Sequence, residues 1–564
     1  MDEPTQRSEP TSDGAGRSYW RWSKHDLFPG DSFHSLQSYR RALSETCPRL
    51  VDRLTNRSTD DYELLQLPKE SENDMRKCLT WWDLMWLSFG AVVGSGIFII
   101  TGQEAHDHAG PAIVLSYAAS GLSALLSAFC YTEFAVEIPV AGGAAGLGRS
   151  WTSYFSTMIK DDPDFLRIRV GSFKEGFNML DPLAVVVLLL ANGIAVSGTR
   201  RTSILNWISS VATTFIIGFI IVVAFIHAKI SNLVPFAPDG AKGVFEAAAV
   251  VFWSYTGFDM VATMAEETKK PSRDIPVGLI GSMTMITVIY CVMALALTMM
   301  QKYTEIDRDA AYSVAFVSIG MNWAKYLVSI SALKGMTTSL LAGSLGQARY
   351  TTQIARSHMI PPLFARVHPR TGTPVNATLL ITIGSAIIAF FSSLDVLSSV
   401  FSFSTLFIFM LMVVALLVRR YYIRDRTSRN DLIKLVVLLC VVIGSSAVGT
   451  ALWSSDKLGW VGYSVAAIVW FVATLVMASV PKKRTPKVWG VPLVPWLPSL
   501  SIAMNVFLLG SLGSVAFWRF LICSAVMLLY YLFIGVHTTY DLAHENEPGS
   551  KYEQGNDEKN GEVL

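Results

Sequence analysis

The chain of 564 residues alternates long apolar stretches with short polar connections. A helix needs about 20 predominantly apolar residues to cross the hydrocarbon core of a bilayer, which is about 30 Å thick. Thirteen stretches approach or exceed that length: 83–101, 112–136, 182–198, 206–227, 243–263, 276–299, 323–348, 375–393, 397–418, 433–453, 459–480, 497–515 and 519–537. The pattern predicts an all-α polytopic membrane protein, and therefore a transporter, a channel, a receptor or a membrane enzyme.

The two ends of the chain are polar. Residues 1–80 lack the apolar core of a signal peptide, so we expect a cytosolic N-terminal region. Within this region, residues 33–57 place leucines and Tyr39 near helical spacing, which predicts an amphipathic helix. Residues 541–564 are polar, and we expect them to form a disordered cytosolic tail.

Composition narrows the function class. The chain is 51% hydrophobic and 16% charged, whereas a soluble protein carries about 25% charged residues. The net charge of +2 argues against a nucleic-acid partner, and the six cysteines lack the spacing of a zinc site or a disulfide framework. The sequence has no Walker A loop, no His-Glu-x-x-His motif and no GxSxG elbow after a strand. We therefore expect no enzyme activity, no catalytic residue, no metal and no cofactor.

Basic residues in the short connections predict the orientation of the spans. Six connections rich in Lys or Arg, including Arg200-Arg201, agree with one another if all of them face the cytosol. With a cytosolic N-terminus, the spans alternate correctly only if the chain crosses once more between residues 138 and 181. That segment has no apolar run of sufficient length. The positions of the basic residues thus predict one membrane crossing for which the sequence has no sufficiently long apolar stretch.

A series of short motifs runs through the chain: Leu79–Leu84, Gly94–Phe98, Cys130–Phe134, Gly257–Asp259, Ala265–Thr268, Pro271–Pro276, Leu333–Thr338, Gly346–Tyr350 and Trp489–Trp496. Together, and in this order, they resemble the plant cationic amino acid transporters of the amino acid–polyamine–organocation superfamily. The resemblance covers roughly residues 30–540. It implies a LeuT-like inverted-repeat bundle with discontinuous helices and fourteen spans, of which we count about thirteen here.

One departure from this family concerns its third transmembrane helix. In the family that helix follows the stretch that is Val140–Gly143 here, but this chain runs on almost directly into Arg149. The resemblance therefore implies a transporter core at 81–420 whose first repeat is short by one helix. Four additional transmembrane helices are expected at 421–540.

Two spans carry glycine interruptions, at Gly94-Ser95-Gly96 and at Gly257-Phe258-Asp259, where the resemblance implies two broken helices. A break frees N–H groups on one half-helix and C=O groups on the other, which a bilayer tolerates only around a polar cavity. The N–H groups suit a carboxylate and the C=O groups suit an ammonium. The pair predicts a binding site for a free amino acid, with Ile97 beside the first break. Close helix packing through Gly90 and Gly94 is the alternative.

Aromatic residues near the second interruption are candidates for covering the substrate. Trp253, Tyr255 and Phe258 could stack on a guanidinium or ammonium group, which is worth roughly 0.5–2 kcal/mol. Ordinary helix packing is the alternative for Trp253 and Tyr255, whereas the resemblance implies that Phe258 is a gate. Asp259 could pair with a basic side chain, or cap the half-helix that restarts there.

Several charged residues lie within or beside the predicted spans. Glu133 lies inside the second span, where an unpaired carboxylate costs roughly 2.5–3.5 kcal/mol, so it is protonated, paired or involved in proton coupling. Lys334 lies mid-span and needs a partner such as Glu133 or Asp259, or it mimics a bound sodium ion, as fixed cations do in some relatives. A further cluster forms either a solvated loop or, by resemblance, an inner cytosolic gate of breakable ion pairs: Glu266, Glu267, Lys269 and Arg273.

The resemblance implies secondary-active, proton-coupled symport of cationic amino acids such as arginine and lysine. Basic amino acids, protons and the lipid bilayer are then the partners. One alternative is a truncated, non-transporting isoform with a regulatory or assembly role, because loss of a helix removes one wall of the cavity. Another is a carrier of neutral amino acids or polyamines. We expect the plasma membrane, with the vacuolar membrane as the alternative.

Overall fold

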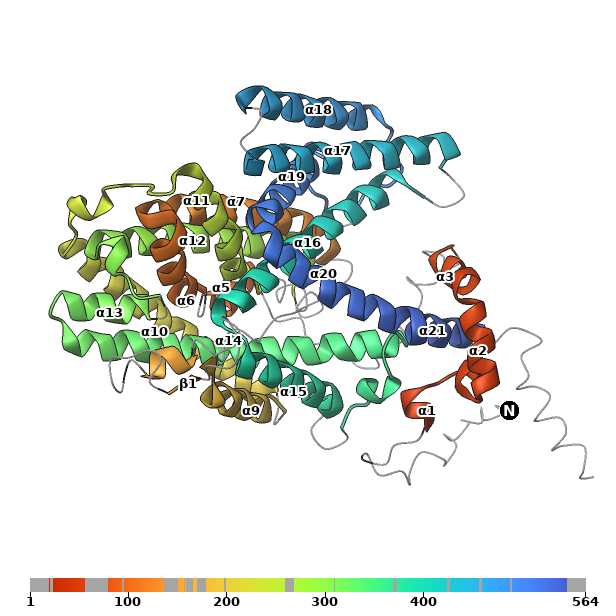
Figure 1. Cartoon of the computed structure of the whole chain (residues 1–564), viewed down its shortest axis with the longest axis horizontal. Coiled ribbons are helices and arrows are strands. Elements are labelled where there is room, and N and C mark those ends of the chain that lie inside the picture. The colour runs from red at the N-terminus through yellow and green to blue at the C-terminus, as the bar shows by residue number, and fades with distance from the viewer. Residues whose placement is uncertain are drawn as a thin grey trace, which may run out of the picture. The chain divides into compact units, whose positions relative to one another are not determined.

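The structure, a computed structural model, consists almost entirely of helices (Figure 1). The chain divides into two compact units: unit 1 comprises Met1–Glu70, Thr351–Ala377 and Val526–Leu564, and unit 2 comprises Ser71–Tyr350 and Thr378–Ala525. The structure describes residues 20, 24–55, 80–93, 96–135, 151–156, 158, 166–169, 179–196, 199–258, 268–308, 310–368, 373–423, 427–455, 459–486 and 489–544.

The helices of the predicted core, residues 81–420, follow one another in chain order. Those of the first half are α5 (Trp81–Val92), α6 (Gly96–Glu104), the π-helical η3 (Ala105–Ala109), η4 (Gly110–Ala112), α7 (Ile113–Ala135), α9 (Pro182–Val196), α10 (Thr199–Ile226) and η5 (Ile230–Leu233). Those of the second half are α11 (Gly240–Val251), η6 (Phe252–Tyr255), α12 (Pro271–Met300), η8 (Tyr303–Glu305), α13 (Ala311–Ser318), α14 (Asn322–Arg356), α15 (Val375–Phe391) and α16 (Leu394–Tyr421). Two short strands, β1 (Ile168–Arg169) and β2 (Met179–Leu180), pair antiparallel.

Four helices follow the core: α17 (Arg429–Ser455), α18 (Gly459–Ser479), α19 (Trp496–Ser511) and α20 (Gly513–Tyr530). Figure 1 shows α17 and α18 side by side, and α19 packs against both α16 and α17. A second apolar cluster fills this region, with Leu416, Leu435, Val442 and Met477 almost fully buried. The predicted block of four additional helices is thus packed onto the last helix of the core.

In their described parts, the thirteen apolar stretches coincide with helices, continuous or interrupted. Within the described residues, six helices are long and apolar enough to cross a membrane, and four more apolar helices are shorter. Their outward faces are apolar as well, since Phe215 of α10 is 77% exposed and Ile468 of α18 is 60% exposed. Apolar surfaces of this extent require lipid rather than water as their solvent. The chain is a multi-pass, all-α membrane protein.

The end of α7 and the start of α9 lie near opposite ends of α16. Glu133, in the last turn of α7, contacts Arg420 at the C-terminal end of α16. Asp181, just before α9, donates its backbone N–H to the carbonyl of Phe390, and only two residues separate α15 from α16. A helix of the length of α16, 28 residues, spans about 42 Å. These contacts agree with the extra crossing that the basic connections demand.

Unit 1 contains the described N-terminal helices α1 (Lys24–Leu27), η2 (Asp31–Phe33), α2 (Leu36–Ser44) and α3 (Thr46–Thr55), with η9 (Pro362–Ala365), the π-helical η10 (Tyr531–Gly535) and α21 (Val536–Ala543). The amphipathic helix predicted at 33–57 is divided at Glu45 into α2 and α3. Pro48 explains the division, because proline fits the first turn of a helix but breaks its interior. Residues 541–543 of the predicted tail are helical, and residues 545–564 lie outside the described part.

Candidate functional site

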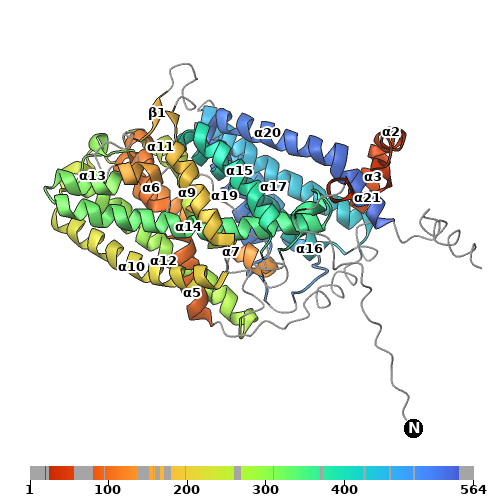
Figure 2. The same ribbon diagram turned by 90° about the horizontal axis from the view of Figure 1, so that it is seen from below.

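The first interruption separates α5 from α6. Helix α5 ends at Val92, and Val93 leaves the helical conformation with φ −82° and ψ 96°. Helix α6 begins at Gly96, and Figure 2 shows α5 and α6 as two separate helices. Gly94 and Ser95, predicted at the centre of the break, lie outside the described residues.

The second interruption begins earlier than the sequence predicts. Helix α11 ends at Val251, a 3-10 turn follows, and Thr256 is extended with φ −72° and ψ 150°. Gly257 has φ +112°, a conformation that side chains with a Cβ rarely adopt. The glycine therefore lies within the interrupted segment, and the α-helix itself is lost from Phe252 onward. Asp259 lies outside the described residues.

The two interruptions meet at Gly96 and Ser254. A Cβ atom built on Gly96 would overlap the Cα and Cβ of Ser254 and lie 2.6 Å from its Oγ. Only glycine permits this approach, because the opposing atoms include backbone that cannot rotate away. Residues 158 positions apart in the sequence thus bring the two broken helices into direct contact.

Tyr290 of α12 connects the two interruptions through its hydroxyl group. The hydroxyl oxygen lies 3.1 Å from the carbonyl oxygen of Val92 and 3.2 Å from that of Ser254. Its single proton can be donated to either carbonyl. Both broken helices therefore direct a carbonyl oxygen at one point. Tyr290 is not among the candidate residues predicted from the sequence. A phenol in the middle of an apolar span is nevertheless a signal for a buried polar contact.

The neighbouring aromatic residues are fully or almost fully buried. Tyr255 donates its hydroxyl to the carbonyl of Tyr117 at 2.8 Å, and the Tyr117 hydroxyl lies 2.7 Å from Thr101 Oγ1. Tyr290 lies between them, with ring centroids 5.5 Å from Tyr117 and 5.2 Å from Tyr255. These contacts surround the meeting point of the interruptions with a tyrosine cluster. Ile97, the second residue of α6, is also fully buried.

Trp253 and Phe258 pack on aromatic residues of α16. Trp253 is stacked on Phe401 at a centroid distance of 6.3 Å, and Phe258 is stacked on Phe409 at 5.1 Å. Phe258 also meets the ring of Tyr131 edge-on at 5.8 Å. In this conformation the candidate gate Phe258 is closed into the core, with none of its surface exposed.

Glu133 is held by two donors at the end of α7. Its Oε2 accepts a hydrogen bond from Arg420 Nη2 at 2.7 Å and another from the backbone N–H of Val491 at 2.9 Å. The side chains of Glu133 and Arg420 are 5% and 8% exposed. A Cβ at Gly490 would lie 2.6 Å from Arg420 Nη2, so glycine leaves room for the guanidinium. Of the readings open in the sequence, the structure shows a paired charge, and the partner is Arg420 rather than Lys334.

Comparison with known proteins agrees with this architecture. The family model described as "Amino acid permease" matches residues 182–494, and the model "C-terminus of AA_permease" matches residues 489–539. The chain is 64% identical to "Cationic amino acid transporter 8, vacuolar" of Arabidopsis thaliana, covering 98% of this chain and 99% of that protein. The chain belongs to the amino acid permease family.

Two further relatives place the permease more narrowly. It is 59% identical to "Cationic amino acid transporter 5" and 49% identical to "Cationic amino acid transporter 1", both of Arabidopsis thaliana. These matches cover 94% of this chain in each case, and 99% and 94% of the relatives. The permease is thus a plant cationic amino acid transporter by family, within the amino acid–polyamine–organocation superfamily, and its activity is amino acid transport rather than enzyme catalysis.

The alignment with the 64%-identical relative is longer than the part of this chain that it covers. It extends over 582 positions, whereas 98% of this chain's 564 residues is about 553 residues. About 30 positions therefore hold residues of the relative alone, a total length that is sufficient for one membrane span. The loss of the family's third helix stays a prediction.

A short helical segment at 151–156 lies within 138–181, the interval in which the sequence predicts a missing helix. Trp151 donates its indole N–H to Thr337 Oγ1 of α14 at 3.1 Å. Tyr154 donates its hydroxyl to the carbonyl of Phe98 in α6 at 2.6 Å. The segment thus contacts both a half-helix of the first interruption and the helix that carries Lys334.

The remaining candidate charges of the permease lie in two places. Lys334 is half-buried in α14, one turn from Thr337, while Lys269 and Arg273 are exposed at the start of α12. Glu266 and Glu267 lie outside the described residues, so their predicted gate with Lys269 and Arg273 stays a prediction.

Proposed function

We propose that the permease moves cationic amino acids, arginine and lysine, by proton-coupled symport with alternating access. The names of the three relatives, all cationic amino acid transporters, support this choice of substrate class. The proposal adds to the family assignment a substrate, a coupling ion and a site, each of which can be tested separately.

The observation that carries the proposal is the contact between the two interruptions at Gly96 and Ser254. A free amino acid presents a carboxylate and an ammonium a few ångströms apart. The start of α6 offers backbone N–H groups to the carboxylate. The carbonyls of Val92 and Ser254, which meet at the Tyr290 hydroxyl, offer acceptors to the ammonium. We place the backbone of the substrate at Gly94–Ile97 and at Trp253–Gly257.

The basic side chain of the substrate needs further contacts. We propose that Trp253, Tyr255 and Phe258 cover it once Phe258 leaves its stack on Phe409, and that Asp259 pairs with it or caps the second half-helix. Lys334 is the proposed coupling or sodium-mimicking charge. The contacts of Glu133 with Arg420 and Val491 favour a structural role for that carboxylate over proton coupling.

The membrane is a separate question. The sequence predicts the plasma membrane, whereas the 64%-identical relative is named as vacuolar. We propose the vacuolar membrane as the first location to examine, with the N-terminus in the cytosol. Imaging of a fluorescent fusion against markers of both membranes distinguishes the two.

A second candidate function is that of a non-transporting isoform with a regulatory or assembly role. The observation in its favour comes from the sequence: residues 138–181 hold no apolar run long enough to form the third helix of the family. A cavity that lacks one wall would bind substrate weakly or leak.

Uptake of labelled arginine into proteoliposomes containing the full chain tests both candidates. We expect saturable uptake that an inward proton gradient stimulates and that excess lysine suppresses more than excess leucine or spermidine does. A protonophore should remove the stimulation. Absence of uptake by correctly reconstituted protein would favour the non-transporting isoform, and stronger competition by leucine or spermidine would favour a neutral amino acid or polyamine carrier.

A further inference from the structure

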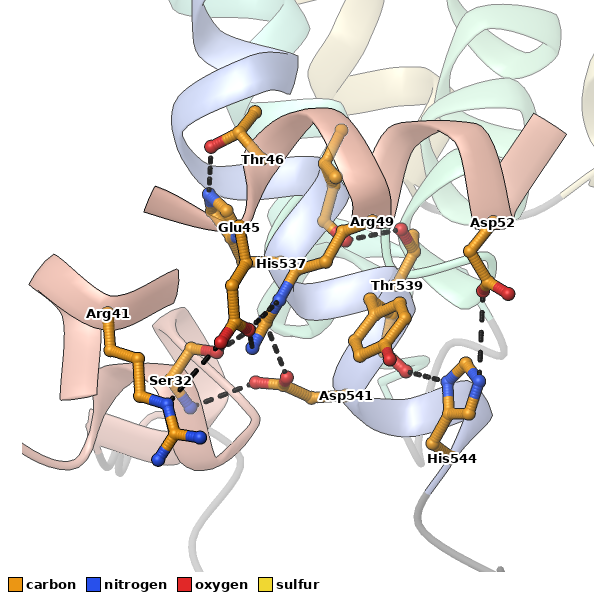
Figure 3. Close-up of polar contacts among 12 residues, drawn as sticks. Ser32, Arg41, Glu45, Thr46, Arg49, Asp52, His537, Thr539, Asp541 and His544 are labelled. Carbon is orange, nitrogen blue, oxygen red and sulfur yellow. Dashed lines mark hydrogen bonds and ion pairs between the residues drawn. The ribbon is translucent and has the colours of Figure 1, made fainter. Parts of the chain in front are cut away.

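Three segments that are far apart in the sequence meet in unit 1: the N-terminal helices within 24–55, the connection between α14 and α15, and the end of the last membrane helix with α21. Figure 3 shows the polar contacts that α3 and the preceding residues make with α21. Neither the family assignment nor the proposed site explains why the two termini are joined in this way.

Asp541 of α21 is the centre of these contacts. Its Oδ1 accepts a hydrogen bond from Arg49 Nη1 at 3.0 Å, and its Oδ2 accepts one from the backbone N–H of Ser32 at 2.9 Å. The side chains of Arg49 and Asp541 are each 12% exposed, so water and salt screen this pair little. Gly30 has φ +103°, and a Cβ there would lie 2.7 Å from Asp541 Oδ2. The turn before η2 is therefore shaped to receive this carboxylate.

Further contacts join the same elements. Arg49 Nη2 lies 3.1 Å from Glu45 Oε2, and the guanidinium lies 4.7 Å above the ring of Tyr540. The hydrogen bond from Arg49 holds the pKa of Glu45 below its usual range. His544 Nε2 lies 3.7 Å from Asp52 Oδ2. Arg49 thus links α2, α3 and α21 through one planar group.

The connection between α14 and α15 is fastened to both terminal segments. Arg366 forms an ion pair with Asp26 of α1. On the other side, a Cβ at Gly535, just before α21, would lie 3.0 Å from the carbonyl oxygen of Met359. The N-terminal helices therefore contact both the connection that follows α14 and the α21 segment that follows the last membrane helix.

We propose that residues 24–55 form a clasp that restrains the transport cycle by holding the α14–α15 connection and α21 together. This inference rests on the proposed function. Alternating access moves one group of helices against another, so their ends must change position. A contact made in one state and lost in another biases the equilibrium between them by its own free energy. Release of the clasp should raise the maximal transport rate and leave KM unchanged, because the interruptions lie in unit 2.

Two variants of the full chain, Arg49→Ala and Asp541→Ala, test the clasp in proteoliposomes. Trypsin cleavage after Arg40 or Arg41, which are exposed but helical, reports how often α2 is released. Cleavage of a transiently open segment follows its population, and loss of one charge-assisted hydrogen bond should raise that population about tenfold. The initial uptake rate is measured at saturating concentration for a panel of basic and neutral amino acids. We expect it to rise several-fold in both variants.

The matched control is Asp431→Ala in unit 2. It removes a partly exposed ion pair in which Lys483 Nζ lies 3.6 Å from Asp431 Oδ2. It should change neither cleavage nor uptake. The effect of the double variant Arg49→Ala/Asp541→Ala should be smaller than the sum of the two single effects, because both substitutions remove the Arg49–Asp541 contact.

The outcomes separate the clasp from the proposed function. Faster cleavage with an unchanged maximal rate would show that the clasp only stabilises the protein, and unchanged cleavage would show that these contacts do not hold α2; either result overturns the proposal. If the protein takes up other amino acids of the panel but not arginine, the proposed substrate is wrong. The uptake rates of those other amino acids then test the clasp. Loss of all transport in the two variants would also contradict a restraining role.

Discussion

The hydroxyl oxygen of Tyr290 lies 3.1 Å from the carbonyl oxygen of Val92, the last residue of α5. This contact places a fixed proton donor where the first broken helix exposes a backbone acceptor. The same hydroxyl lies 3.2 Å from the carbonyl of Ser254 in the second broken helix. One side chain of α12 therefore sets the distance between the two acceptors that we assign to the substrate ammonium.

Replacement of this residue in the variant Tyr290→Phe removes the hydroxyl and keeps the ring. We expect KM for arginine to rise about tenfold, since a lost hydrogen bond to a polar partner is worth about 1–1.5 kcal/mol. Radiolabelled uptake over a range of arginine concentrations measures the change. Tyr421→Phe is the control, because the buried Tyr421 hydroxyl has no hydrogen-bond partner within the described residues. An unchanged KM in Tyr290→Phe would contradict the assigned role.

The variant Gly96→Ala tests the contact between the interruptions. The added methyl group would overlap Ser254, and overpacking of this kind costs about 1–3 kcal/mol. We expect a lower unfolding temperature and loss of uptake. In contrast, Gly218→Ala in α10 adds a Cβ with no atom within 4 Å and should be neutral or stabilising, as alanine in a helix is favoured over glycine by roughly 0.5–1 kcal/mol. Equal effects of both variants on thermal unfolding would argue against a close approach at Gly96.

The variant Glu133→Ala leaves the Arg420 guanidinium buried without its carboxylate. Breaking a buried pair by removing one partner costs about 3–5 kcal/mol, so we expect a large fall in the unfolding temperature of the purified protein. Asp431→Ala breaks a pair that is 27–28% exposed and should cost at most about 1 kcal/mol.

A second variant, Glu133→Gln, separates stability from proton coupling. If Glu133 is structural, Glu133→Gln lowers the unfolding temperature and leaves the stimulation of uptake by a proton gradient intact. Loss of that stimulation at an unchanged unfolding temperature would instead assign Glu133 to coupling.

The passage of the chain along α16 predicts opposite membrane sides for two tags. An epitope tag inserted at Arg169, which is exposed in β1, should be accessible only from the side away from the cytosol. A tag inserted at residues 197–198, between α9 and α10, should be accessible only from the cytosol. Antibody binding to intact and to permeabilised cells or vesicles measures this. Both tags on one side would contradict a crossing between α7 and α9.

Much of this architecture follows from the sequence, because spanning lipid is a local requirement. The described parts of the long apolar stretches are mostly helical, and the basic connections predict that the chain changes sides before Asp181, in agreement with the contacts at the two ends of α16. The interruptions were also predictable, since glycine weakens a helix wherever it occurs. The sequence predicted the second break at Gly257, which is later than the structure shows. The 3-10 turn from Phe252 to Tyr255 contains no glycine, so no residue in it indicates a break.

Only the tertiary structure decided which distant groups meet. The sequence contains many basic residues that could pair with Glu133, and in the folded chain its partner is Arg420, 287 positions away. The same is true of Gly96 with Ser254, of Tyr290 with two carbonyls, and of the N-terminal helices with Asp541. Hydropathy and periodicity describe how each segment meets lipid or water, one segment at a time. Pairing between segments depends on how helices pack against one another, and no local pattern in the chain records that.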